Sequence, residues 1–143
     1  MNGKTFVDSN ILLYAYDRCA GWKQDSARRV LLDLWLQKSG ILSMQVLQEF
    51  YYNVTRKIGT PLPKTVARRI VGNYSRWCVE ASPAQIVTAF SIEDEARISF
   101  WDALIVASAL KSGASRILTE DLNAGQRIAG ILIENPFIPP NAE

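Results

Sequence analysis

Short apolar runs alternate with longer helical patterns along this 143-residue chain, and the alternation constrains its fold more than any other feature. Runs of strand length occur at 4–8, 41–43, 78–82, 116–119 and within the ILIENPF segment near the end. Parallel strands need a crossover between them, usually a helix. The pattern therefore predicts a single α/β domain, α/β/α in layers, with a central parallel sheet.

The helices between these runs are predicted from apolar periodicity and from residues that begin and end helices. Gly40 is expected as a C-terminal cap, and Ser82-Pro83-Ala84-Gln85 resembles a capping box with Pro at the first helical position. The helix that contains FWDALIVASAL is apolar around most of its circumference, which predicts a buried helix. The expected helices are 10–17, 23–39, 44–58, 64–77, 83–90, 91–97 and 99–112.

The chain contains no histidine, which removes several kinds of chemistry at once. Ser-His-Asp and Cys-His nucleophilic sites are excluded, and so are zinc sites that need a His ligand. The two cysteines, Cys19 and Cys78, have no Cys-x-x-Cys spacing and are expected to be small core residues. Any catalysis must use carboxylates, hydroxyls, amides, Lys or Arg, and oxygen ligands favour Mg²⁺ or Mn²⁺.

The composition, 48% hydrophobic and 21% charged, is that of a globular domain rather than a disordered chain. No segment approaches the roughly 18 apolar residues of a membrane span. The N-terminal MNGKTFVDSN lacks the apolar region of a signal peptide, so we expect a cytoplasmic protein without a membrane partner.

The net charge of +2 is unevenly distributed along the chain. Residues 23–76 contain ten Lys and Arg against three Asp and Glu, whereas residues 77–143 contain four against nine. This difference fits basic amphipathic surface helices. It also fits a basic face for a polyanion beside an acidic centre that needs a metal.

Two acidic residues follow predicted strands. Asp8 ends the first strand, and an N-cap for the next helix would explain it equally well. Asp121 follows the strand at 116–119, where a turn or an N-cap for residues 122–127 is the alternative. Its neighbour Glu120 is expected to face solvent. Because ligands bind outside the carboxyl ends of parallel strands, Asp8 and Asp121 are expected at one edge.

Two further acidic residues interrupt apolar helices. Glu49 lies in QVLQEFYYNV, where a boundary position that reaches solvent is the alternative. Asp102 lies in the buried helix, where Ser99 and Asp102 also fit a capping box. Four converging carboxylates without a matching cation would repel each other, and a divalent metal would resolve the repulsion. Such a site activates water and stabilises the departing oxygen in phosphodiester cleavage.

Four blocks of the chain, in this order, resemble the PIN-domain ribonucleases, especially the VapC-type toxins of toxin–antitoxin modules: VDSNILLYAYD, LQEF, FWDALIVASAL and LTEDLNAGQRIAGILIENPF. The resemblance spans essentially the whole chain. It implies one Rossmann-like PIN domain over residues 1–143, with residues 136–143 as a loose C-terminal tail. It also implies a Mg²⁺- or Mn²⁺-dependent endoribonuclease, usually a homodimer, with a cognate antitoxin.

The resemblance carries site residues over by position. Asp8, Glu49, Asp102 and Asp121 match the acidic quartet, with Asp8, Asp102 and Asp121 as metal ligands. Glu49 would hold a metal-bound water or a second ion. The polar positions that orient the carboxylates match Ser9, Asn10 and Thr119, with Ser9 standing where the family often has Thr.

Basic side chains are expected to hold the RNA backbone, although each of them also fits a solvated helix surface. The candidates are Arg28, Arg29, Arg56, Lys57, Lys64, Arg68 and Arg69. The aromatic side chains that could stack on unpaired bases, or belong to the core, are Tyr14, Tyr51, Tyr52 and Trp77. The amphipathic helices at 23–38 and 44–77 could equally carry dimer and antitoxin contacts.

Two other functions remain open from the sequence. One is a metal-dependent DNA nuclease or a small phosphatase, although the chain lacks added helical segments for clamping DNA. The other is a non-catalytic module that binds RNA or an antitoxin. Binding of RNA without turnover in Mg²⁺ would favour the binding module.

Overall fold

Strand β1 (Lys4–Val7) lies inside the sheet, with a neighbouring strand on each side, and its Phe6 and Val7 are fully buried. The structure is a computed structural model that describes residues 3–138. Within them the sheet has five strands in the order β2-β1-β3-β5-β4. The other bounds are β2 (Gly40–Ile41), β3 (Ala114–Leu118), β4 (Arg127–Ile128) and β5 (Ile131–Glu134). All neighbours pair parallel except β4 with β5, so the predicted α/β fold with its central, mostly parallel sheet is confirmed.

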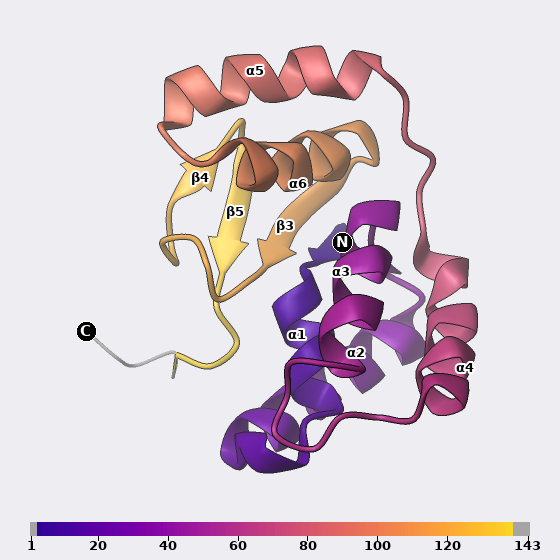
Figure 1. Ribbon diagram of the computed structural model, residues 1–143. Helices are drawn as coiled ribbons and strands as arrows, with labels where there is room; N and C mark the ends of the chain where they lie inside the picture. The colour runs from indigo at the N-terminus through magenta and orange to yellow at the C-terminus, as the bar shows by residue number, and fades with distance from the viewer. Residues whose placement is uncertain (1–2, 139–143) are drawn as a thin grey trace.

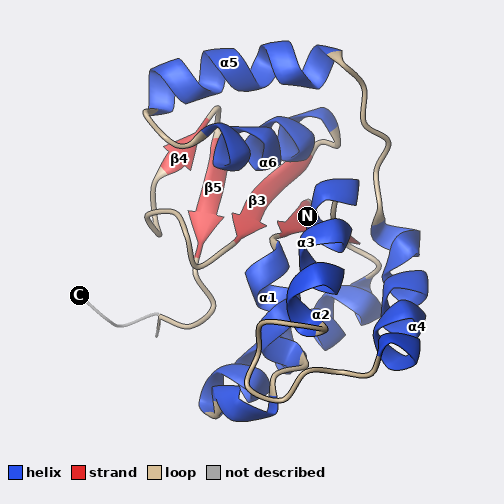
Figure 2. Cartoon of the chain, viewed as in Figure 1, coloured by secondary structure: helices blue, strands red, loops and turns tan. Residues whose placement is uncertain are grey.

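The helices form two groups around this sheet (Figure 1). Helix α5 packs mainly against α6, and α6 packs on β3 and β5. The first four helices gather on the other side of the molecule, where α1 contacts both α2 and α3 (Figure 2). The bounds are α1 (Ser9–Ala15), α2 (Trp22–Gln37), α3 (Met44–Val54), α4 (Lys64–Tyr74), α5 (Ala84–Ala96) and α6 (Phe100–Lys111).

The structure differs from the predicted elements at three places. The run at 78–82 is not a strand, since only Cys78 pairs, in a single parallel bridge with Leu42. The two helices expected at 83–90 and 91–97 are one continuous helix, α5, because Ala89 and Ile92 both bury against the core without a break between them. Strand β4 was not predicted, since a two-residue strand carries no periodic signal.

The predicted helix caps are only partly right. Helix α2 ends at Gln37, and Lys38 rather than Gly40 adopts the left-handed conformation, with φ of 56°. Gly40 instead lies in β2, where an added Cβ would come within 2.6 Å of the Trp77 ring. At the start of α5 half of the capping box forms, because the Gln85 side chain accepts a hydrogen bond from the Ser82 backbone N–H at 2.7 Å.

Burial was predicted for α6 and for the two cysteines, and a loose tail was predicted for the C-terminal segment. Helix α6 is buried on most sides, as predicted. Cys19 is exposed and Cys78 partly buried, so Cys19 is not a core residue. In the expected tail, Phe137 is buried against Tyr14, while residues 139–143 lie outside the described residues. None of the helices that the structure describes has both the length and the apolarity of a membrane-spanning segment.

Candidate active site

Asp8 leaves β1 at its carboxyl end and is 5% exposed. One carboxylate oxygen accepts the backbone N–H of Ser9 at 2.7 Å, and the other accepts the Thr119 hydroxyl at 2.8 Å. Burial raises the pKa of Asp8 from 3.8 to about 6, against these two hydrogen bonds, and the charges of Asp121 and Glu49 add to the rise. Asp8 is the N-cap of α1, so the capping interpretation is right, but capping leaves its charge uncompensated.

Asp121 is the neighbour that the other three acidic residues share. It follows β3 through Thr119, whose side-chain oxygen accepts the Asp121 backbone N–H at 3.1 Å. Its carboxylate is exposed and accepts a hydrogen bond from the Asn10 amide at 3.1 Å. The negative charge of Asp121 contributes to a raised pKa at each of the other three carboxyl groups: Asp8, Glu49 and Asp102.

Glu49 approaches the same place from α3. It is half-buried, and its carboxylate accepts the Ser9 hydroxyl at 3.2 Å. Burial raises the pKa of Glu49, hydrogen bonds from Ser9 and Gln45 act in the opposite direction, and the charges of Asp102 and Asp121 raise it further. The interpretation of Glu49 as a residue that simply reaches solvent therefore does not fit its contacts.

Asp102 lies in the first turn of α6 and is half-buried. The Ser99 side chain caps this helix by accepting the Asp102 backbone N–H at 3.1 Å, so the capping motif predicted there forms. Burial raises the pKa of Asp102, a hydrogen bond with Ser99 lowers it, and the charge of Asp121 raises it. We call these four side chains, Asp8, Glu49, Asp102 and Asp121, the acidic cluster.

No protein cation balances the acidic cluster within the described part of the chain. The ion pairs formed there are Lys23 with Glu120 and Arg116 with Glu134, and neither involves a member of the cluster. Uncompensated carboxylates near one another favour a bound cation, and their oxygens suit Mg²⁺ or Mn²⁺.

The acidic cluster is open rather than a closed cage. Among residues 3–138, no three acidic or cysteine side chains are arranged so as to hold a metal ion by themselves. Mg²⁺ commonly keeps several waters and binds through one or two carboxylates together with substrate phosphates. The donor set therefore fits Mg²⁺ completed by water and substrate, and it does not fit a dedicated all-protein site.

The three polar residues predicted to support the carboxylates all join the network. Ser9 and Thr119 donate to Glu49 and Asp8, as described above. Asn10 makes further bonds, because its amide nitrogen also donates to the Thr119 side chain at 3.3 Å and its oxygen accepts the Glu120 N–H at 3.3 Å. These bonds tie the start of α1 to the segment after β3.

The contacts of Gln45 were not predicted from the sequence, and those of Glu120 were predicted wrongly. Gln45 donates to the backbone oxygen of Trp101 at 3.4 Å and hydrogen-bonds Glu49, so it links α3 to the start of α6. Its position four residues before Glu49 could have indicated this. Glu120 does not simply face solvent, because it accepts the Tyr14 hydroxyl at 2.6 Å and pairs with Lys23.

The basic residues expected to bind RNA lie on α2, after α3 and on α4, and the structure gives them no bond to the acidic cluster within its described residues. Arg28 donates to the Ala15 carbonyl at 2.8 Å, and Arg68 donates to the Tyr51 hydroxyl at 3.2 Å. Arg56 and Lys57 both lie over the exposed Tyr52 ring. The others, Arg29, Lys64 and Arg69, are exposed.

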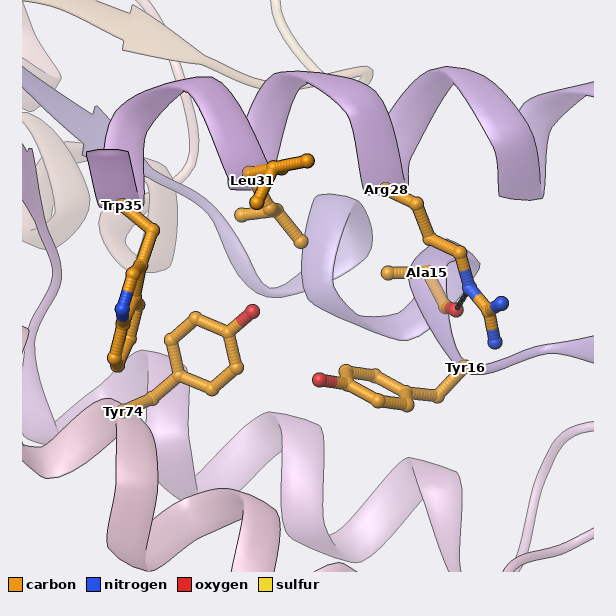
Figure 3. Close-up of a pocket in the computed structure, with 7 residues that line it drawn as sticks. Ala15, Tyr16, Arg28, Leu31, Trp35 and Tyr74 are labelled. Carbon is orange, nitrogen blue, oxygen red and sulfur yellow. Dashed lines mark hydrogen bonds between the residues drawn. The ribbon is translucent and has the colours of Figure 1, made fainter. Parts of the chain in front are cut away.

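A separate groove of about 310 Å³ lies between α1, α2 and α4 (Figure 3). It is mainly apolar, and Figure 3 shows Arg28 at one end with Tyr16 and Tyr74 facing the interior. None of the acidic cluster lines it. Trp77 packs against Trp35 and Tyr74 and is 8% exposed, so of its two interpretations the core one fits.

Comparison with known proteins gives one family match and several structural matches. Residues 5–130 match the PIN domain family. No curated protein matches the sequence. A VapBC2 complex from Rickettsia felis bound to promoter DNA is 21% identical, with 92% of this chain and 97% of that chain covered and a TM-score of 0.64.

Two further solved structures have the same fold at similar identity. DNA-bound VapBC from Salmonella typhimurium is 20% identical, with 94% of this chain and 98% of that chain covered and a TM-score of 0.67. VapC20 from Mycobacterium tuberculosis, described as a toxin that cleaves the sarcin-ricin loop, is 18% identical over 80% of this chain and 87% of that chain, with a TM-score of 0.59.

Proposed function

The chain belongs to the PIN domain family, and from this premise we propose that it is a metal-dependent endoribonuclease that acts as the toxin of a toxin–antitoxin pair. The observation that carries the proposal is the acidic cluster at the carboxyl ends of β1 and β3, which has no protein cation of its own among the described residues. Four carboxylates on a scaffold without histidine suit metal-assisted phosphodiester hydrolysis better than any other hydrolytic chemistry.

Asp8, Asp102 and Asp121 would hold Mg²⁺ or Mn²⁺ together with water and substrate oxygens. Once bound, the metal would supply Lewis acidity for the attacking water and for the departing oxygen. The protein's own part is to hold the carboxylates in place. Thr119 and the Ser9 N–H fix both oxygens of Asp8, and Asn10 donates one hydrogen bond to Asp121.

Glu49 is the group best suited to take a proton from water. Its carboxylate is half-buried and is oriented by the Ser9 hydroxyl. Its pKa is raised by burial, and a base is more effective when its pKa lies closer to the working pH. Because the chain has no histidine, a carboxylate must do this work.

The substrate and partners follow from the surface and from the similar structures. Exposed Arg and Lys side chains on α2, after α3 and on α4 would bind an RNA backbone. Several similar structures are toxin–antitoxin complexes, which supports a protein antitoxin as the partner here. A homodimer is part of the proposal.

The test is cleavage of total cellular RNA by the purified protein, with Mg²⁺ or Mn²⁺ and with chelator. Discrete fragments should appear only with metal. Asp8→Asn should abolish them, and Glu49→Gln should slow their formation by about 10²–10⁴-fold. The control Asp33→Asn changes an exposed carboxylate on α2 and should cleave like the wild type.

Two results would contradict the proposal. Cleavage of single-stranded DNA but not RNA would favour the DNA nuclease. Metal-dependent stabilisation of the protein and binding of RNA without any cleavage would favour the non-catalytic binding module.

A further inference from the structure

The residue between Thr119 and Asp121 makes contacts that the proposed reaction does not use. Glu120 accepts the Tyr14 hydroxyl at one carboxylate oxygen, at 2.6 Å, and the Lys23 ammonium at the other, at 2.5 Å. The side chains on either side have different partners, since Thr119 bonds Asp8 and Asp121 bonds Asn10. Thr119 and Asp121 therefore bond within the site, whereas Glu120 between them bonds to Tyr14 and Lys23.

The Lys23 side chain is 31% exposed, and its ammonium has neighbours beyond the ion pair. It lies 4.9 Å from the centre of the Tyr14 ring and 5.4 Å from the centre of the Phe137 ring. Phe137 is buried edge-to-face on Tyr14, with ring centres 5.0 Å apart. An ammonium held by a carboxylate and two aromatic rings is more restricted than a surface lysine in an ordinary ion pair.

The Asp121 carboxylate, by contrast, is weakly held. It is exposed, and within the described chain its only hydrogen bond to another side chain comes from Asn10. Its position therefore depends on the backbone of residues 119–121. That backbone is held by Asn10 on one side, through the Glu120 N–H, and by the Glu120 carboxylate on the other.

We propose that Lys23, Tyr14 and Glu120 form a clamp that positions Asp121 in the acidic cluster. The clamp joins α1, the first turn of α2 and the end of β3. Lys23 and Tyr14 are thus positioning residues, which act on the metal through Asp121. This inference rests on the proposed metal site.

The test is the Mn²⁺ concentration that gives half of the maximal thermal stabilisation, measured for the wild type, Lys23→Met, Glu120→Gln, the double variant and Lys23→Arg. Residues that orient metal ligands typically contribute 10–100-fold to affinity, so the midpoint should rise roughly tenfold in Lys23→Met and in Glu120→Gln. The double variant should match the single ones, because both break one clamp. Lys23→Arg keeps the positive charge, so its Mn²⁺ midpoint should stay close to that of the wild type.

Hydrogen exchange in chelator gives a readout that does not depend on metal or activity. The amides of Glu120 and Asp121 should exchange faster in Lys23→Met than in the wild type. Lys111→Met and Glu80→Gln, which change exposed charges away from the clamp, should leave the midpoint and these amides unchanged.

Several outcomes would overturn the clamp. A lower melting temperature with an unchanged Mn²⁺ midpoint would mean that the ion pair is merely structural. Tighter Mn²⁺ binding in Lys23→Met would mean that the freed Glu120 joins the site. A wild type that neither Mn²⁺ nor Mg²⁺ stabilises would overturn the proposed function itself and the clamp with it, whereas a responsive wild type with unaffected variants overturns the clamp alone.

Discussion

At the scale of single residues, Asp8 is at once a helix cap and a buried charge. Its hydrogen bonds with Ser9 and Thr119 stabilise the ionised form, but burial outweighs them and raises its pKa to about 6. Without a cation, the ionised Asp8 therefore destabilises the folded protein. The proposed metal site, rather than stability, would explain a carboxylate at this position.

Asp8→Asn should make the metal-free protein more stable. Because the pKa is about 6 when folded and 3.8 when unfolded, the folded state binds more protons between these values, and wild-type stability falls as pH rises from about 4 to 6. In chelator at pH 8 the variant should gain on the order of 3 kcal/mol in free energy of unfolding. Denaturant unfolding from pH 3 to 8 measures this.

The gain should disappear at about pH 3, where the carboxyl group is mostly protonated in both states. Asp33→Asn, which changes an exposed carboxylate, is the control and should show no such pH dependence. A loss of stability at pH 8 in Asp8→Asn would instead mean that the charged cap of α1 outweighs the burial of the charge.

At the scale of elements, the close approach of β2 to the Trp77 ring limits which residues can replace Gly40. A Cβ there would meet three ring atoms at 2.6–2.7 Å. The ring packs against Trp35 and Tyr74, and moving it would disturb these contacts. Gly40→Ala should therefore lower the free energy of unfolding by about 1–3 kcal/mol, as overpacked core substitutions do.

Gly72→Ala is the matched control for this prediction. Gly72 lies on the exposed side of α4, and a Cβ added there would have no atom within 4 Å among those outside its own helical turn. The change should raise the free energy of unfolding by about 0.5–1 kcal/mol, since Ala favours a helix over Gly. Equal melting temperatures for the two variants would contradict the steric explanation at Gly40.

Local sequence patterns predicted the elements that carry the acidic cluster. Asp8 and Asp121 could be placed at one edge because the carboxyl ends of parallel strands share an edge, and α6 was recognised by its apolar circumference. The run at 78–82 failed because a strand requires a partner, and only Cys78 finds one. Glu120 was placed in solvent because its partner Lys23 lies 97 residues away.

At the scale of the whole molecule, the basic residues and the acidic cluster belong to different groups of elements. The candidate RNA-binding side chains lie on α2, after α3 and on α4, whereas the cluster also draws on β3 and α6. A polyanion can therefore be held by the basic helices while its phosphate reaches the acidic cluster only with a metal.

RNA binding in chelator should accordingly weaken as salt increases. The logarithm of the binding constant should fall linearly with the logarithm of salt concentration, by roughly 0.7 per phosphate contact for a single strand. Changing Arg68 and Arg69 to Gln together should make this slope shallower, as measured by fluorescence anisotropy. Lys111→Gln is the control, and an unchanged slope in the arginine variant would mean that α4 does not touch the RNA.

The outermost strands of the sheet, β2 and β4, have only two residues each. Beyond β2, Leu42 is already paired with Cys78, and β4 runs against the direction of the other strands. An edge this short offers few free N–H and C=O groups on which a foreign strand could add. The fold thereby resists edge-to-edge aggregation.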